Sequence, residues 1–68
     1  MALIEHEYNA YLDKYVNVWV ADDKSELVAD FDSESAPSSM IFVISTQETY
    51  MKNTAGKWQK MGSSEVVA

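Results

Sequence analysis

Residues 40–62, MIFVISTQETYMKNTAGKWQKMG, constrain the fold more than any other stretch, because they predict two consecutive β-hairpins. Ile41 and Val43 alternate with large apolar neighbours, which is typical of a strand covered on both sides. A turn at residues 45–48 and a returning strand at residues 49–52 complete the first hairpin. The second turns at residues 53–56, where Gly56 supplies the positive φ that ends a type I turn with a bulge. Residues 57–61 return as the last strand.

The first third of the chain leaves two interpretations open. Large apolar residues recur there at steps of three and four, which predicts a helix; they are Ile4, Tyr8, Tyr11, Leu12, Tyr15 and Trp19. From Asp13 to Ala21, however, valines alternate with aromatic and polar residues, and this enrichment in β-branched and aromatic side chains favours a strand. We therefore expect a short helix or helical turn before Leu12, followed by a strand through about Ala21. An extended N-terminal arm is the alternative.

The middle and the end of the chain carry mostly turn and loop signals. Residues 22–26 form a turn cluster, residues 27–31 are compatible with a short edge strand, and residues 32–39 form a loop in which Pro37 ends regular structure. The sequence thus predicts one small domain: a helix or arm at residues 1–12, a β domain at residues 13–61, and a tail at residues 62–68 that is flexible or captured by a neighbour. The fold class is mainly β, a small antiparallel sheet or barrel-like domain of about four to five strands.

Size and composition favour association with other molecules. A domain of 68 residues buries only about 60% of its unfolded surface, so its stability is marginal without help. The chain has no cysteine, which removes disulfides and thiolate metal sites as sources of that help. Its residues are 47% hydrophobic and 12% aromatic, a large apolar load for so short a chain. We expect a homo-oligomer or incorporation into a larger assembly.

The distribution of charge excludes several classes of partner. Residues 1–39 carry nine acidic and two basic residues, residues 40–68 carry two acidic and three basic residues, and the net charge is −6. Because neutralisation of phosphates supplies most of the affinity for nucleic acids, we expect no direct nucleic-acid binding. The same charge argues against an anionic membrane surface, and no apolar run approaches a transmembrane length. The N-terminal residues lack the features of a secretory signal, so we expect use without export.

The residues with chemical potential do not form a catalytic or metal-binding pattern. Asp30, Asp32 and Glu34 alternate like the opening of a calcium loop, but Ser35 replaces the glycine and Ile41 the final glutamate of that pattern. His6 lies between two glutamates that point away from it on a helix or a strand, so we expect a structural or exposed histidine. No nucleophile elbow, phosphate-binding loop or dinucleotide motif is present. We predict no enzymatic activity, no catalytic residue, no metal site and no cofactor.

Aromatic and apolar residues are the better candidates for a functional surface. Tyr and Trp dominate protein–protein hot spots, although a core can absorb the same residues. The candidate interface residues are Leu3, Ile4, Tyr8, Tyr11, Leu12, Tyr15, Trp19, Tyr50 and Trp58. Tyr50 and Trp58 lie on neighbouring predicted strands, where core packing is the favoured interpretation and a partner contact the sharper one.

The segment from Ser25 to Gly62 resembles a module common in small bacteriophage structural proteins and fibre-associated chains. The shared features are the small-residue loop APSS, the apolar strand FVI, the strand TYMKN and the final GKW. Where that module carries a glycine in the small-residue loop, this chain has Ser38 or Ser39. The resemblance implies a non-enzymatic virion component of the head, neck, tail or a fibre, in contact with other virion proteins. An acidic phage-encoded inhibitor of a host protein, in which residues 22–34 imitate nucleic acid, is the alternative.

Overall fold

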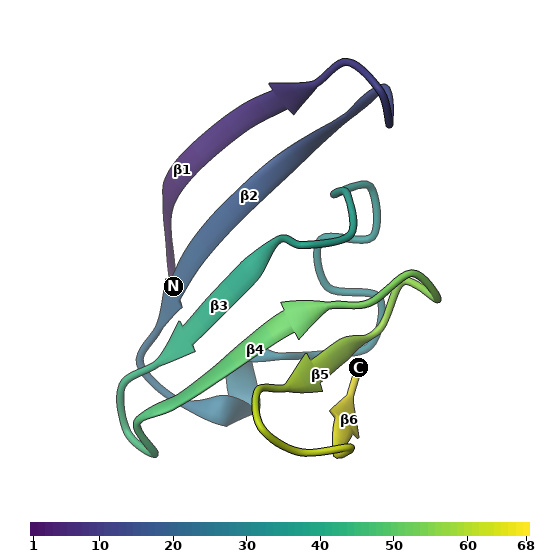
Figure 1. The fold of residues 1–68 in the computed structure, drawn as a ribbon. Helices are drawn as coiled ribbons and strands as arrows, with labels where there is room; N and C mark the ends of the chain where they lie inside the picture. The colour runs from purple at the N-terminus through teal and green to yellow at the C-terminus, as the bar shows by residue number, and fades with distance from the viewer.

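A computed structural model describes all residues, 1–68, as one open mixed sheet of six strands in the order β1-β2-β3-β4-β5-β6 (Figure 1). The strands are β1 (Ala2–Asn9), β2 (Lys14–Ala21), β3 (Met40–Val43), β4 (Glu48–Lys52), β5 (Trp58–Lys60) and β6 (Val66–Val67), and a single 3₁₀ turn, η1 (Lys24–Glu26), follows β2. The predicted mainly β character is confirmed. The sheet has more strands than expected, and it is not purely antiparallel.

β2 and β3 are parallel, whereas every other neighbouring pair is antiparallel. Parallel neighbours need a long connection, and residues 22–39 supply it. In Figure 1 this crossover passes behind the sheet. The predicted edge strand at residues 27–31 is wrong: these residues belong to the crossover, where Leu27 is buried and Phe31 packs between Trp19 and Trp58. Burial of these two side chains, rather than backbone pairing, holds the segment in place.

The N-terminal helix is also wrong, because residues 2–9 form β1, an extended arm in the sense of the alternative. β1 pairs with β2 along its length, with Tyr8 opposite Tyr15 and Leu3 opposite Trp19. The aromatic spacing that predicted a helix therefore arises from two strands folded onto each other. A helix of this length is marginal in isolation, whereas the β-branched β2 offers a paired strand. The register shifts by one residue between Leu3 and Glu5, which leaves Ile4 unpaired in a bulge.

The core lies between the sheet and the crossover. Its buried apolar residues are Ala21, Leu27, Ile41, Val43, Tyr50 and Trp58. Both predicted C-terminal hairpins are present: β3 pairs with β4 and β4 with β5. In the second turn the Gly56 N–H donates to the Asn53 carbonyl at 3.0 Å, and Gly56 has φ +81°. The turn at residues 53–56 therefore forms with the positive φ at Gly56 that the sequence predicted.

η1 ties several distant segments together. Asp23 caps it by accepting from the Ser25 N–H, and the Glu26 carboxylate accepts from the Asp23 N–H, which completes a capping box. Glu26 also lies 3.1 Å from the N-terminal amine, and Lys24 pairs with Glu65 at 2.9 Å. Hydrogen bonds from Ser25 and Ser45 lower the pKa of Asp23 to about 2.

The C-terminal tail forms a strand in this structure. β6 pairs with β5, and the Lys60 N–H donates to the Glu65 carbonyl at 2.8 Å. Val67 and Ala68 pack against the core. The sequence predicted a tail that is flexible or captured by a neighbour, whereas in this structure its residues 66–67 pair with β5 of the same chain. Val67 and Ala68 provide the packing, and Glu65 the ion pair with Lys24, that the composition of the tail did not suggest.

Candidate functional site

β1 and the first half of β2, residues 2–17, form an arm whose outer part, residues 6–17, projects beyond the rest of the sheet (Figure 1). β3 begins to pair with β2 only at Val18, so this half of the hairpin has no further strand beside it. Large apolar side chains are exposed along the arm: Leu3, Ile4, Tyr8, Tyr11, Leu12 and Tyr15. Tyr11, at the tip, is fully exposed, and the others are about half exposed. Six of the nine predicted interface residues thus lie on one accessible hairpin.

Aromatic stacking gives the arm a defined surface. The rings of His6 and Tyr15 stack with centroids 3.8 Å apart, and Tyr8 meets Tyr15 edge-on at 5.4 Å. The Tyr8 hydroxyl donates to the carboxylate of Asp13, and this hydrogen bond raises the pKa of Tyr8. These three rings come from both strands of the hairpin, so the surface depends on the β1–β2 register.

A polar bridge joins the base of the arm to the crossover. The Asp32 carboxylate accepts hydrogen bonds from the Trp19 indole N–H at 2.7 Å and from the Asn17 amide at 3.1 and 3.3 Å. The Asn17 amide oxygen lies 2.6 Å from His6 Nδ1, which therefore carries the proton in this arrangement. Trp19 is half-buried and is held by this bridge and by Phe31. Of the acidic residues that resembled a calcium loop, Asp32 is engaged internally.

Lys52 fastens the crossover from the other side. Its side chain is 3% exposed, and its ammonium donates to the Asp32 carbonyl at 2.5 Å and to the Ser35 hydroxyl at 2.9 Å. It also lies 5.4 Å from the centre of the Trp58 ring. Burial lowers the pKa of Lys52, and the charge of Asp32 opposes this shift. The ammonium is satisfied by the protein, and its role here is to hold the loop.

Tyr50 and Trp58 are withdrawn from the interface set. Both have no exposed surface, and both belong to the core cluster. The Trp58 indole donates to the Phe31 carbonyl at 3.1 Å, so even its polar end is used inside the chain. The interpretation as core residues, favoured on sequence grounds, describes them correctly.

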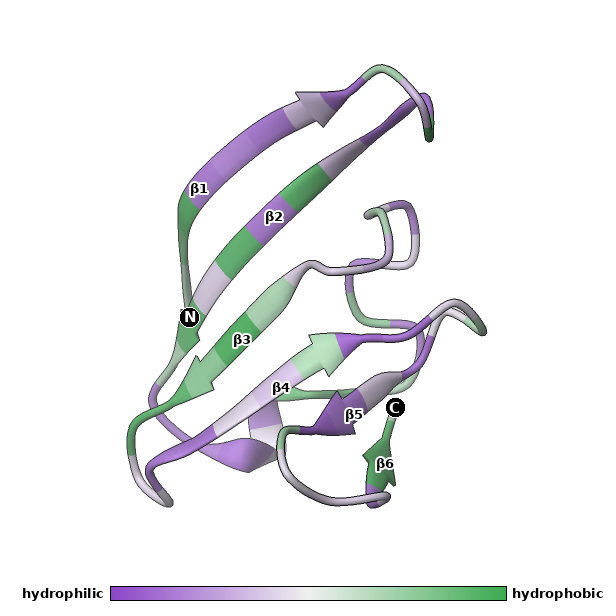
Figure 2. Cartoon of the chain, in the orientation of Figure 1, coloured by the Kyte–Doolittle hydropathy of each residue, from purple (hydrophilic) through white to green (hydrophobic).

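The sequence interpretation missed a second exposed surface, the face of the sheet opposite the crossover. We call it the open face and define it by six apolar residues on the sheet: Val18, Val20, Met40, Phe42, Met51 and Met61. Each is at least partly exposed, whereas their neighbours in the chain, such as Ile41 and Tyr50, are buried on the other face. Figure 2 shows the hydrophobic residues of β2 and β3 as adjacent bands in the middle of the sheet. The apolar run of β3 suggested a strand covered on both sides, which hid this face.

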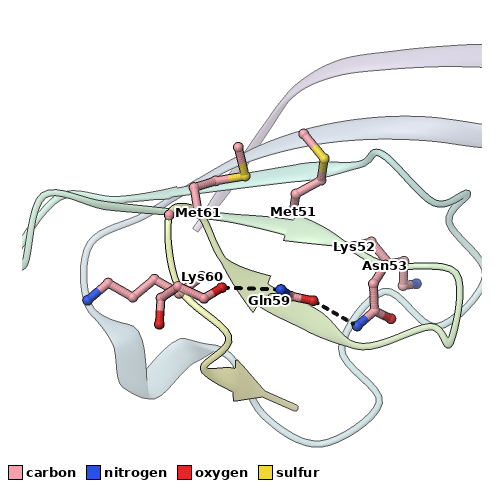
Figure 3. A pocket seen from close by; sticks show the side chains of 8 residues that line it. Met51, Lys52, Asn53, Gln59, Lys60 and Met61 are labelled. Carbon is pink, nitrogen blue, oxygen red and sulfur yellow. Dashed lines mark hydrogen bonds between the residues drawn. The ribbon is translucent and has the colours of Figure 1, made fainter.

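A shallow hollow of about 230 Å³ opens at the edge of the open face, between β4 and β5. Figure 3 shows Met51 and Met61 extending to the same side of the sheet above Gln59. The Gln59 amide donates to the Ser63 carbonyl at 3.2 Å and accepts from Asn53 at 3.5 Å. The hollow is smaller than the usual small-molecule pocket, and it widens the open face rather than forming a separate site.

Comparisons with protein families, with curated proteins and with solved structures found no match to the chain. No group of three or more histidine, aspartate or glutamate side chains converges in a way that could hold a metal ion. The structure contains no helix that is long and apolar enough to span a membrane. The candidate functional site is therefore defined by geometry alone, as the exposed arm and the open face.

Proposed function

We propose that the protein is a non-enzymatic structural component that assembles with other proteins through its β1–β2 arm. The observation that carries this proposal is the exposure of six large apolar residues on the β1–β2 hairpin, whose outer part, residues 6–17, has no third strand beside it. Tyrosines at the tip and on the flank supply rigid amphipathic anchors of the type found at protein–protein hot spots. The polar bridge and Lys52 hold the base of the arm against the core, which favours a preorganised contact.

The assembly we propose is a bacteriophage particle, with the chain as a head, neck, tail or fibre-associated component in contact with other virion proteins. Support for this setting is the resemblance of residues 25–62 to the modules of such proteins, together with an arm suited to docking on a larger subunit. Contacts in the particle would add the stability that a domain of this size lacks, since a partner that binds only the folded state stabilises it.

The test is incorporation into particles. Mass spectrometry of particles purified from cells infected with the phage that carries the gene should detect the chain. A variant with Tyr11→Ser and Leu12→Ser should be lost from the particles while remaining folded, because both side chains are exposed. Val28→Ser is the matched control, since Val28 is 60% exposed on the crossover, away from the arm. Absence of the unaltered chain from the particles would overturn the proposal, and so would equal incorporation of the arm variant and the control.

One observation bears on the alternative of an acidic inhibitor. Asp30 and Glu34 on the crossover are exposed and form no hydrogen bond or ion pair, whereas Asp32 is turned into the polar bridge. An acidic surface that imitates nucleic acid would therefore use Asp30 and Glu34. Inhibition of a host nuclease or polymerase that disappears in the Asp30→Asn, Glu34→Gln double variant would favour this function over the virion.

A further inference from the structure

No part of the chain covers the open face. The crossover packs on the opposite face, where Phe31 and Leu27 join the core. β6 extends the sheet beside β5 instead of crossing over the open face. Yet the middle of this face is apolar across neighbouring strands: Val18 pairs with Met40, and Met40 with Met51. A contiguous apolar patch of this kind on a small domain marks a contact surface.

Glu5 and Glu7 on one side of the open face are opposite in charge to Lys57 on the other side. On β1, Glu5 pairs with Val18 and Glu7 with Val16, so both carboxylates border the open face on that side. On the far side Lys57 immediately precedes Trp58, whose side chain is in the core, so alternation places Lys57 with Gln59 on the open face. The three ion pairs of the chain involve none of these residues. All three charges are exposed.

The register brings Glu7 and Lys57 to the same level of the sheet. Val18 and Gln59 lie in one row, through Met40 and Met51. Val16, the partner of Glu7, is two residues before Val18, and Lys57 is two residues before Gln59 on a strand of the same direction. A two-fold axis that runs parallel to the strands, outside the open face, therefore puts the Glu7 edge of one copy against the Lys57 edge of the other.

We propose that a second copy of this chain occupies the open face, in a symmetric face-to-face dimer whose apolar centre is flanked by two Glu7–Lys57 pairs. Two twisted sheets pack in this way about 10 Å apart, with strands inclined by about 30°. Three methionines in the patch, Met40, Met51 and Met61, provide flexible side chains that fit an imperfectly flat surface. The inference goes beyond the proposed function, because Tyr8 and Tyr15 lie on the opposite face of the arm from Glu7 and stay free for other partners.

The alternative contact between two copies, edge to edge through β1, is disfavoured by the same charges. Antiparallel pairing of two β1 strands about His6 would place Glu5 of one copy opposite Glu7 of the other. Like charges directly opposite each other destabilise a strand pair, and charged residues on edge strands prevent such pairing. The acidic edge thus blocks one mode of self-association and complements the other.

Sedimentation velocity of the full chain over a range of concentrations tests the proposal. We expect a monomer–dimer equilibrium in which Glu7→Lys or Lys57→Glu alone raises the dissociation constant about three- to ten-fold at low salt. The double variant Glu7→Lys, Lys57→Glu should restore it to within about two-fold of the original value. Glu34→Lys is the control for net charge, because Glu34 lies on the crossover. Phe42→Lys, in the centre of the patch, should abolish the dimer; circular dichroism checks that each variant folds.

Each outcome decides the matter. A chain that stays monomeric at every concentration overturns the proposal, and so does a dimer on which both single reversals and the Glu34→Lys control act alike. Loss of the dimer in the single reversals with recovery in the double variant supports it, even where Phe42→Lys fails to fold. The arm variant Tyr11→Ser, Leu12→Ser should dimerise normally. If this arm variant dimerises but is missing from particles, that result bears on the proposed function and not on the dimer.

Discussion

Lys52 shows how one buried charge shapes the molecule. It donates to the Asp32 carbonyl and to Ser35 in a setting that is almost closed to water. We predict that Lys52→Met, although close in size, lowers the free energy of unfolding by about 1–3 kcal/mol, because the buried Ser35 carbonyl loses its donor and the Asp32 carbonyl keeps only the Ser35 N–H and hydroxyl. Chemical denaturation followed by tryptophan fluorescence measures this loss. Lys14→Met is the control, since Lys14 is exposed; equal effects of the two substitutions would refute the assigned role.

Asp32 differs from the other acidic residues of its segment, Asp30 and Glu34, because its carboxylate is hydrogen-bonded inside the chain. Asp32→Asn should destabilise the fold by about 1–2 kcal/mol, because it removes a charged acceptor of the Trp19 and Asn17 hydrogen bonds. Asp30→Asn, on an exposed side chain without hydrogen bonds, should have almost no effect. Urea titrations of the two variants make the comparison. Equal stability of both would contradict the bridge.

The single residues also show the limit of sequence interpretation. The acidic segment departs from the pattern of a calcium loop at Ser35 and Ile41, but nothing in the sequence distinguished Asp32 from Asp30. The distinction arises from the parallel pairing of β2 with β3, which brings residue 32 beside Trp19. The burial of Lys52 was hidden for the same reason: its acceptors are backbone and hydroxyl oxygens of a loop seventeen or more residues away.

At the scale of elements, the turn between β4 and β5 depends on one glycine. Gly56 has φ +81°, and a Cβ at that position would meet no atom within 4 Å. Gly56→Ala should therefore cost about 1 kcal/mol through backbone strain alone. Thr54→Ala in the same turn is the control, because Thr54 is exposed and is not among the residues with positive φ. Thermal unfolding of the two variants checks the prediction; a Gly56→Ala chain as stable as the control would contradict it.

The acid stability of the fold should depend on two elements, η1 and the start of β4. Hydrogen bonds lower the pKa of Asp23 to about 2, and Lys60, followed by Thr46, lowers the pKa of Glu48 to about 2. Because both values are below those of the unfolded chain, the stabilisation is complete near neutral pH. It is lost as the pH falls from about 4 to 2, where the unfolded chain binds protons first.

Unfolding free energies measured at several pH values test this dependence. The Asp23→Asn, Glu48→Gln double variant should lose stability at neutral pH. Its free energy of unfolding should also fall less steeply between about pH 4 and 2, the acid limb of the curve. Glu34→Gln removes an exposed carboxylate without hydrogen bonds and should keep the steep limb. An unaltered acid limb in the double variant would show that other carboxylates govern it.

Prediction of the elements succeeded where local chemistry decides the structure. The two C-terminal hairpins follow from β-branched runs and from the Asn53–Gly56 turn, and both are present. The helix before Leu12 failed because an aromatic repeat at three and four residues also results from two paired strands. The strand in the tail was not predicted, because its pairing with β5 and its contact with Lys24 are interactions with other segments of the chain. Local signals contain no information on either.

At the scale of the whole molecule, the crossover divides the sheet into two faces of different character. One is closed by residues 22–39 and contains the core; the other is open, apolar in the middle and bordered by opposite charges. The arm adds a second accessible surface on the same strands. The sequence suggested the arm residues as contact candidates. The open face could be recognised only once the strand order was known, because the pairing of β2, β3 and β4 brings its residues together.

The open face, as the contact surface between two copies, is tested most directly by the methyl groups of the four methionines. Met40, Met51 and Met61 belong to the open face, whereas Met1 lies at the N-terminus beside η1. In NMR spectra of methyl-labelled protein, recorded over a series of concentrations, the signals of Met40, Met51 and Met61 should shift together while that of Met1 stays fixed. Four signals that do not change with concentration, or a shift confined to Met1, would contradict the account.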